Sequence, residues 1–209
     1  MSRSPEIVVV TGNHPFRERA FDAMLQALRG VCARRLPLES LLTETVPSQA
    51  EGYLFYNFHQ EEPDSSVRGW IESLLERGVG LVVLHHALLA WPTWPLWDCI
   101  VGASGRDEFS YYPAQRLTVR VADREHPIVR GVTDWEMTDE TYRMPEPGQG
   151  VHLLLTTDHP NSSRAVGWAH QQGRARVFCF QSGHDNRAWD RSEFRQVVEN
   201  ALLWTTGRL

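Results

Sequence analysis

The chain has 209 residues, of which 42% are hydrophobic and 22% charged, and its formal net charge is −5. This length suits one folded unit, so we expect a single domain over residues 1–209. The mild negative charge gives no reason to expect a nucleic acid or an anionic membrane as a partner. No apolar run reaches the roughly 20 residues of a membrane span, and the N-terminus lacks the apolar core of a secretory signal, so the expected location is cytoplasmic.

The cysteines argue against a disulfide framework or a cysteine-based zinc site. Cys32, Cys99 and Cys179 are far apart, odd in number and include no CxxC pair. We expect them to be small buried hydrophobic residues. Histidine and tryptophan are the unusual residues of the composition, with nine and eight copies.

The first half of the chain alternates apolar runs with amphipathic segments. Strands are predicted at residues 6–11, 31–38, 52–58 and 80–84, and helices at about 21–28 and 67–75, the second capped by Ser65 or Ser66. The polar stretch Glu39 to Glu51 is expected to be a loop. This order of elements predicts an α/β fold, flavodoxin-like and doubly wound, with a mainly parallel sheet and helices on both faces.

The second half has a different pattern. Residues 115–121 alternate in polarity like a half-exposed strand, and further strands are predicted at 151–157, 165–169 and 175–181. Residues 171–174 are typical of a hairpin turn, and a closing helix is expected from about Ser192.

Histidines follow several predicted strands at the point where each strand ends. In open α/β sheets, ligands bind beyond the carboxyl ends of the strands, so these side chains are expected to converge on one cleft. The residues are His14, His59, the pair His85 and His86 after the central strand, and His184 with Asp185.

Imidazole suits this position for two reasons. Its unperturbed pKa near 6.5 allows proton transfer near neutral pH. Two or three imidazoles with a carboxylate also make an open zinc or iron site. The acid and the phenol of the cluster from Asp139 to Tyr142 could reach the same cleft. The sequence contains no HExxH motif, so any metal site must be assembled from residues that are far apart in the chain.

Two readings of the central segment stay open. If the chain remains extended, His85 and His86 face opposite ways, so at most one enters the cleft, and we favour His85. Trp91, Trp94 and Trp97 either pack the segment onto the body of the protein or form an aromatic wall for a sugar ring.

Several motifs in order carry a resemblance to a known family. They are Gly80 to Ala87 with the Trp-rich segment and Val101-Gly102, His126-Pro127-Ile128, Asp139 to Tyr142, Ala165 to Trp168, Gly173 to Val177, and Gly183-His184-Asp185 with Trp189. Over roughly residues 6–205 the sequence resembles the trehalose-utilisation (ThuA-like) proteins, a branch of the class I glutamine amidotransferase-like fold.

The resemblance implies what the central turn does. In amidotransferases of this fold a nucleophilic cysteine lies at the sharp turn after the central strand, with a later histidine and acid as partners. Here that turn holds His85 and His86, and His184 matches the later histidine. A thiol nucleophile and amidotransferase activity are therefore not expected. Members of the family are associated with the metabolism of trehalose and related, often oxidised, sugars.

These observations predict an enzyme that acts on a small carbohydrate at the strand ends. His85, His184 and Glu140 are the expected catalytic residues; His14, Trp91, Tyr142 and Asp185 are expected to bind substrate. His85 and His184 are the candidate ligands of a divalent metal such as zinc.

Two alternatives stay open beside this prediction. One is a non-catalytic sugar- or metabolite-binding protein, and the other is an amidohydrolase-type reaction with a metal-activated water. The expected partner is a small sugar-like molecule, not a nucleic acid or a membrane. The oligomeric state is left open, with a homo-oligomer among the alternatives.

Overall fold

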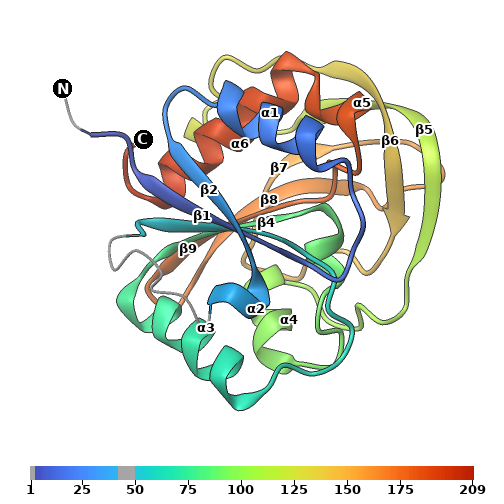
Figure 1. Ribbon diagram of the computed structural model, residues 1–209. Coiled ribbons are helices and arrows are strands. Elements are labelled where there is room, and N and C mark those ends of the chain that lie inside the picture. The colour runs from blue at the N-terminus through green and yellow to red at the C-terminus, as the bar shows by residue number, and fades with distance from the viewer. Residues whose placement is uncertain (1–2, 42–49) are drawn as a thin grey trace.

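The computed structural model describes residues 3–41 and 50–209, in which nine strands form one sheet (Figure 1). The strand order is β2-β1-β3-β4-β9-β8-β7-β5-β6. The strands are β1 (Glu6–Gly12), β2 (Cys32–Pro37), β3 (Gly52–Asn57), β4 (Gly80–Leu84), β5 (Ser110–Val121), β6 (Trp135–Arg143), β7 (His152–Thr156), β8 (Ala165–Gln172) and β9 (Ala175–Phe180). The helices are α1 (Glu18–Ala27), α2 (Leu38–Leu41), α3 (Ser65–Arg77), α4 (Pro95–Val101), α5 (Asn186–Trp189) and α6 (Ser192–Thr205), with 3-10 turns η1 (His85–Leu89) and η2 (Pro127–Val129).

The parallel half of the sheet consists of β2, β1, β3, β4 and β9. Its order is that of flavodoxin-like folds, in which the winding reverses between β1 and β3. β3 and β4 are buried at every residue because helices cover both of their faces. The carboxyl ends of these strands therefore meet at one edge of the sheet.

The other half of the sheet is antiparallel, which corrects the prediction of a mainly parallel sheet. β9 pairs antiparallel with β8, β8 with β7, β7 with β5, and β5 with β6. The connection from β8 to β9 is a tight turn at Gly173, where φ is 58°. Such a short connection can join only antiparallel neighbours, since a parallel pair needs a long crossover.

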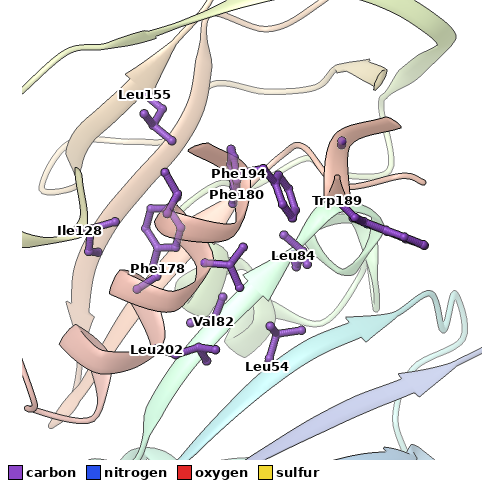
Figure 2. Close-up of a cluster of buried hydrophobic side chains, with 14 of the residues drawn as sticks. Leu54, Val82, Leu84, Ile128, Leu155, Phe178, Phe180, Trp189, Phe194 and Leu202 are labelled. Atoms are coloured by element: carbon purple, nitrogen blue, oxygen red, sulfur yellow. The ribbon is translucent and has the colours of Figure 1, made fainter. Parts of the chain in front are cut away.

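Helices cover both faces of the sheet, and each face has its own core. α1 and α6 pack on one face, and α3 and α4 on the other (Figure 1). Figure 2 shows the first of these cores, in which Phe194 and Leu202 of α6 lie over side chains of β4 and β9. This packing fixes β4 and β9 side by side, and both strands end at the candidate site.

Two local features differ from the sequence expectations, and a third agrees with them. Asp64, rather than Ser65 or Ser66, caps α3, because its carboxylate accepts from the backbone N–H groups of Ser66 and Val67. The predicted loop over residues 39–51 begins inside α2, and its residues 42–49 lie outside the described part of the chain. None of the helices in residues 3–41 and 50–209 combines the length and apolar character needed to cross a bilayer.

Candidate functional site

The chain turns sharply at the end of β4, and His85 lies at the turn. Its φ of 54° is in the left-handed region, which a non-glycine residue seldom adopts. The side chain is fully buried, and Nδ1 lies 2.7 Å from the carbonyl oxygen of Gln181. A carbonyl oxygen can only accept, so Nδ1 carries the proton and donates it. In the neutral ring, Nε2 therefore presents its lone pair to the site.

The loop after β9 brings His184 to the same place. The buried carboxylate of Asp139 accepts from the backbone N–H groups of Gly183, at 2.7 Å, and of His184, at 3.0 Å. On the other side, the hydroxyl of Tyr56 donates to the carbonyl oxygen of Gly183 at 2.9 Å. Held in this way, Nδ1 of His184 lies 3.2 Å from Nε2 of His85.

Glu140 and Tyr142 enter from β6, in the antiparallel half. One carboxylate oxygen of Glu140 lies 3.6 Å from Nε2 of His85 and 3.5 Å from Nδ1 of His184. The hydroxyl of Tyr142 donates to Nε2 of His85 at 2.8 Å. The ligand atoms of His85, His184 and Glu140 all lie within 4.8 Å of one another, and no other group of three such residues occurs in the described part of the chain.

Burial and charge shift the pKa values of the acidic groups here. Burial raises the pKa of Asp139, although its hydrogen bonds to backbone N–H groups and the nearby His85 oppose this. Burial also acts to raise the pKa of Glu140, but the neighbouring imidazoles of His85 and His184 outweigh it and the pKa is lowered. Burial and the charge of Glu140 raise the pKa of Tyr142 well above its usual value. Glu140 is thus an ionised acceptor, and Tyr142 remains a donor.

A cavity of about 340 Å³ opens beside these groups. Glu140 and Tyr142 line it, whereas His85 lies behind them with no exposed surface. Tyr111, 62% exposed, also contributes to the lining. The remaining lining residues are aromatic, apolar or imidazole side chains: His14, Phe58, His86, Leu89 and Phe109.

His14 and His86 form a stacked pair in the wall of the cavity. Their ring centroids are 4.2 Å apart and their planes differ by 22°. Burial, reinforced by the positive charge of neighbouring histidines, lowers the pKa of His14 and brings the pKa of His86 well below its usual value. Both rings are therefore neutral near pH 7.

The expectation for the histidine pair is wrong, because it assumed an extended chain. The chain instead turns at His85 into η1, and both rings reach the site. His86 is the one that lines the cavity, and its ring lies edge-on to His85 at 5.3 Å between centroids.

Comparison with known proteins identifies the family. The family model for trehalose utilisation, ThuA, matches residues 7–205. The chain belongs to the ThuA family. A search of the curated proteins gives no match.

Solved structures show the same fold. A putative ThuA-like protein from Parabacteroides merdae has a TM-score of 0.81 at 17% identity, over 98% of this chain and 90% of the other. A second, from Bacteroides uniformis, has a TM-score of 0.71 at 16% identity, over 98% and 93%. PurLQS from Thermotoga maritima has a TM-score of 0.62 at 14% identity, over 97% and 99%. At these identities the likeness shows the fold, which this ThuA-family chain shares with class I glutamine amidotransferases.

Two of the predicted substrate-binding residues of this ThuA-family protein lie outside the cavity beside Glu140. Trp91 is 1% exposed, packs on Trp97, and stacks on His59 in the wall of a second cavity of about 790 Å³. Asp185 caps α5 and forms an ion pair with Arg187 at 2.7 Å. Their predicted roles stay predictions, while His14, His85, Glu140, Tyr142 and His184 are brought together.

Arg106 is an important residue of this ThuA-family site that the sequence does not reveal. It is fully buried and donates to the carbonyl oxygens of Leu88, Ala90 and Trp91 at 2.7, 2.8 and 3.0 Å. It also pairs with Asp98 at 2.7 Å. These bonds fix the loop that carries His85 and His86. From the sequence alone, an arginine between Gly105 and Asp107 would be predicted to lie on the surface.

Asp139 could have been found from the strand pattern. Alternate residues of β6 are buried, including Trp135, Met137 and Asp139. An acid at a buried strand position needs partners, and the backbone of the loop after β9 provides them.

None of the three cysteines of this ThuA-family chain lines the cavity beside Glu140. The expectation that all three are buried is wrong for Cys32 and Cys99, which are exposed, and is confirmed for Cys179, which is buried in β9. Burial raises the pKa of the Cys179 thiol, which contacts the carbonyl oxygen of Val101 at 3.5 Å. A buried, neutral thiol is inert as a nucleophile.

Proposed function

We propose that this protein is an enzyme that acts on a small carbohydrate, at a cleft in which His85, His184 and Glu140 hold a divalent metal such as zinc. The observation that carries the proposal is the convergence of three ligand atoms within 4.8 Å beside a cavity of about 340 Å³. The family description, trehalose utilisation, supports the class of substrate.

The donor set suits a catalytic metal. Two imidazoles and one carboxylate are three protein ligands, which leave a position open for a substrate or water. Metal-ligating histidines commonly donate their other ring N–H to a carbonyl group, as His85 does to Gln181. A divalent ion bound there would act as a Lewis acid toward an oxygen of the substrate.

The other side chains supply binding and proton transfer. The carboxylate of Glu140 lines the cavity in its ionised form; one oxygen would bind the metal, and the other could accept a proton from a hydroxyl or a C–H group beside a carbonyl. The hydroxyl of Tyr142 stays protonated; it donates to Nε2 of His85 in this structure, and a metal bound at that nitrogen would free it to donate to a sugar oxygen. Phe58, Leu89 and Phe109 give an apolar wall that excludes water and packs on the C–H face of a ring.

The same geometry argues against two covalent mechanisms. An imidazole stands at the turn after β4, so a cysteine-dependent amidotransfer lacks its nucleophile there. All 21 basic residues of the chain are arginines, so no lysine is present to form an imine with a sugar carbonyl.

A turnover assay with matched variants tests this proposal. Untagged protein is incubated with zinc and a panel of neutral sugars that includes trehalose and keto-sugars, and products are detected by NMR. We expect His85→Ala and His184→Ala each to reduce turnover by roughly 100-fold or more. His152→Ala is the control, because His152 lines a separate pocket with His126 and Trp204. Turnover that survives in both site variants would contradict the proposal.

A second candidate is a sugar-binding protein without catalysis. It is favoured by the imidazole that stands where an amidotransferase keeps its nucleophile. Calorimetric binding of a sugar, with no product detected by mass spectrometry, would support this candidate over the enzyme. Turnover that persists in the presence of a chelator would instead support metal-free proton transfer.

A further inference from the structure

We propose that Tyr111, at the mouth of the cavity beside Glu140, determines specificity by stacking its ring on the C–H face of a sugar. The inference commits to an uncharged ligand with two sugar rings, one held inside the cavity and one against Tyr111. It rests on the proposed function, because it concerns the same cavity and names the kind of sugar that the cavity would select.

Tyr111 is accessible to a ligand, whereas the tryptophan expected to form an aromatic wall is not. Trp91 is 1% exposed, and Tyr111 is 62% exposed and lines the cavity. The Tyr111 side chain has no hydrogen-bond, ring or cation–π partner within residues 3–41 and 50–209. Single exposed hydrophobic residues are ordinary, so it is the position of this ring in the cavity wall that indicates a ligand. A ligand that covers the ring removes apolar surface from water, which favours binding.

The strand register places Tyr111 on the same face of the β5–β6 ribbon as two residues of the site. Tyr111 is the direct antiparallel partner of Tyr142, and side chains opposite each other in such a pair lie on one face. Glu140 precedes Tyr142 by two residues in β6, so it shares that face. All three side chains accordingly line the cavity, and the ribbon that carries them forms one edge of the sheet (Figure 1).

A β-bulge lies next to Tyr111 in β5. The register shifts between Tyr112 and Gln115, so two residues of β5 oppose one residue of β6. One of the two, Ala114, has a φ of 56°, in the left-handed region. Bulges bend a strand and increase its twist, and beside an active site they can redirect a side chain. Here the bulge sets the direction of the strand end that carries Tyr111.

The size and charge of the cavity favour an uncharged ligand with two rings. Its volume of about 340 Å³ lies at the lower end of the range for ligand cavities, which is roughly 300–1,000 Å³. A sugar ring inside the cavity leaves the outer part of Tyr111 exposed, and a second ring would cover it. The charge of Glu140 disfavours an anion, and the divalent metal of the proposed function would offset that charge and disfavour a cation.

The test compares a sugar of two rings with a sugar of one ring. Calorimetry measures binding of trehalose, glucose and choline to wild type, Tyr111→Ala and Tyr111→Phe in the presence of zinc. We expect wild type to bind trehalose more tightly than glucose or choline. Tyr111→Ala should weaken trehalose binding by about tenfold and glucose binding by no more than about twofold. Tyr111→Phe keeps the ring and should bind trehalose within about twofold of wild type.

Tyr112→Ala is the matched control, because the next residue of a strand faces the other way and Tyr112 is not among the residues that line the cavity. It should bind both sugars as wild type does.

Four results would each overturn the inference: unchanged trehalose binding in Tyr111→Ala, an equal loss for glucose and trehalose, tighter binding of choline than of trehalose by wild type, or loss of trehalose binding in Tyr111→Phe. Failure of wild type to bind trehalose would overturn it as well. If turnover is lost in His85→Ala while Tyr111→Ala keeps the trehalose affinity of wild type, the inference fails and the proposed function stands.

Discussion

His85 and His86 are neighbours in the sequence, but they face different surroundings. His85 is fully buried, and both of its nitrogens have partners in Gln181 and Tyr142. His86 is equally buried, and neither of its nitrogens has one. The first arrangement fixes a tautomer, and the second places a neutral imidazole inside an aromatic stack with His14.

The lowered pKa of His86 predicts how stability changes with pH. Above pH 6.5 the ring is neutral in the folded and unfolded states, so it adds no pH dependence. Below pH 6.5 the unfolded chain takes up a proton that the folded protein refuses. The free energy of unfolding should therefore fall on acidification, by up to about 1.4 kcal/mol per pH unit from this residue.

Urea unfolding at about pH 7.5 and about pH 5.5 measures this effect. The free energy of unfolding of wild type should be lower at the acidic pH than at the higher pH. The decrease in His86→Phe should be clearly smaller. His14, whose pKa is also lowered, leaves part of the slope in the variant. An identical slope in both proteins would show that His86 is protonated as easily in the fold as in the unfolded chain.

Among the elements, η1 depends on a buried cation for its shape. The carbonyl groups of Leu88, Ala90 and Trp91 converge on the guanidinium of Arg106, which reaches them from a loop after α4. The planar guanidinium presents five donors in a fixed arrangement, whereas an ammonium group presents three on a flexible stem. Lysine at this position would leave buried acceptors without partners.

We therefore predict that Arg106→Lys lowers the free energy of unfolding by about 2–4 kcal/mol. Equilibrium urea unfolding gives the value. Arg116→Lys is the matched control, because Arg116 is exposed in β5 and pairs with Glu136 at 2.6 Å; its effect should stay within about 0.5 kcal/mol. A loss for Arg106→Lys as small as that of the control would contradict the role given to Arg106.

The two halves of the molecule were not equally predictable from the sequence. Buried apolar runs in β1, β3 and β4 identify the parallel half, since each run is apolar on both faces. The later strands alternate in polarity, which indicates a half-exposed strand but says nothing about its neighbour. In the sheet, β8, β7 and β5 lie between β9 and β6. Packing of the whole fold decides this order, and no local sequence pattern shows it.

The site combines contributions from both halves, and this limits what a sequence rule can find. The rule that ligands bind beyond parallel strand ends finds His14, His85 and His184. Glu140 lies within β6 instead, and was suggested by the cluster of acids and a phenol at residues 139–142 rather than by a position after a strand. Arg106 has no local pattern at all, because only the folded loop shows that carbonyl groups surround it.

In the molecule as a whole, we propose that the parallel and antiparallel halves of the sheet together build one metal centre. His85 and His184 come from the parallel half, and Glu140 comes from the antiparallel ribbon of β5 and β6. Each residue supplies one ligand, so removal of any one should weaken binding even though the others remain in place.

The most direct test is calorimetric titration of zinc into untagged protein that has first been stripped with a chelator. We predict that wild type and His152→Ala bind one zinc ion per chain, and that His184→Ala and Glu140→Gln bind it at least roughly 10- to 100-fold more weakly. Circular dichroism checks that each variant is folded. If wild type takes up no zinc, or if folded His184→Ala and Glu140→Gln bind it as wild type does, then His85, His184 and Glu140 do not form a metal site.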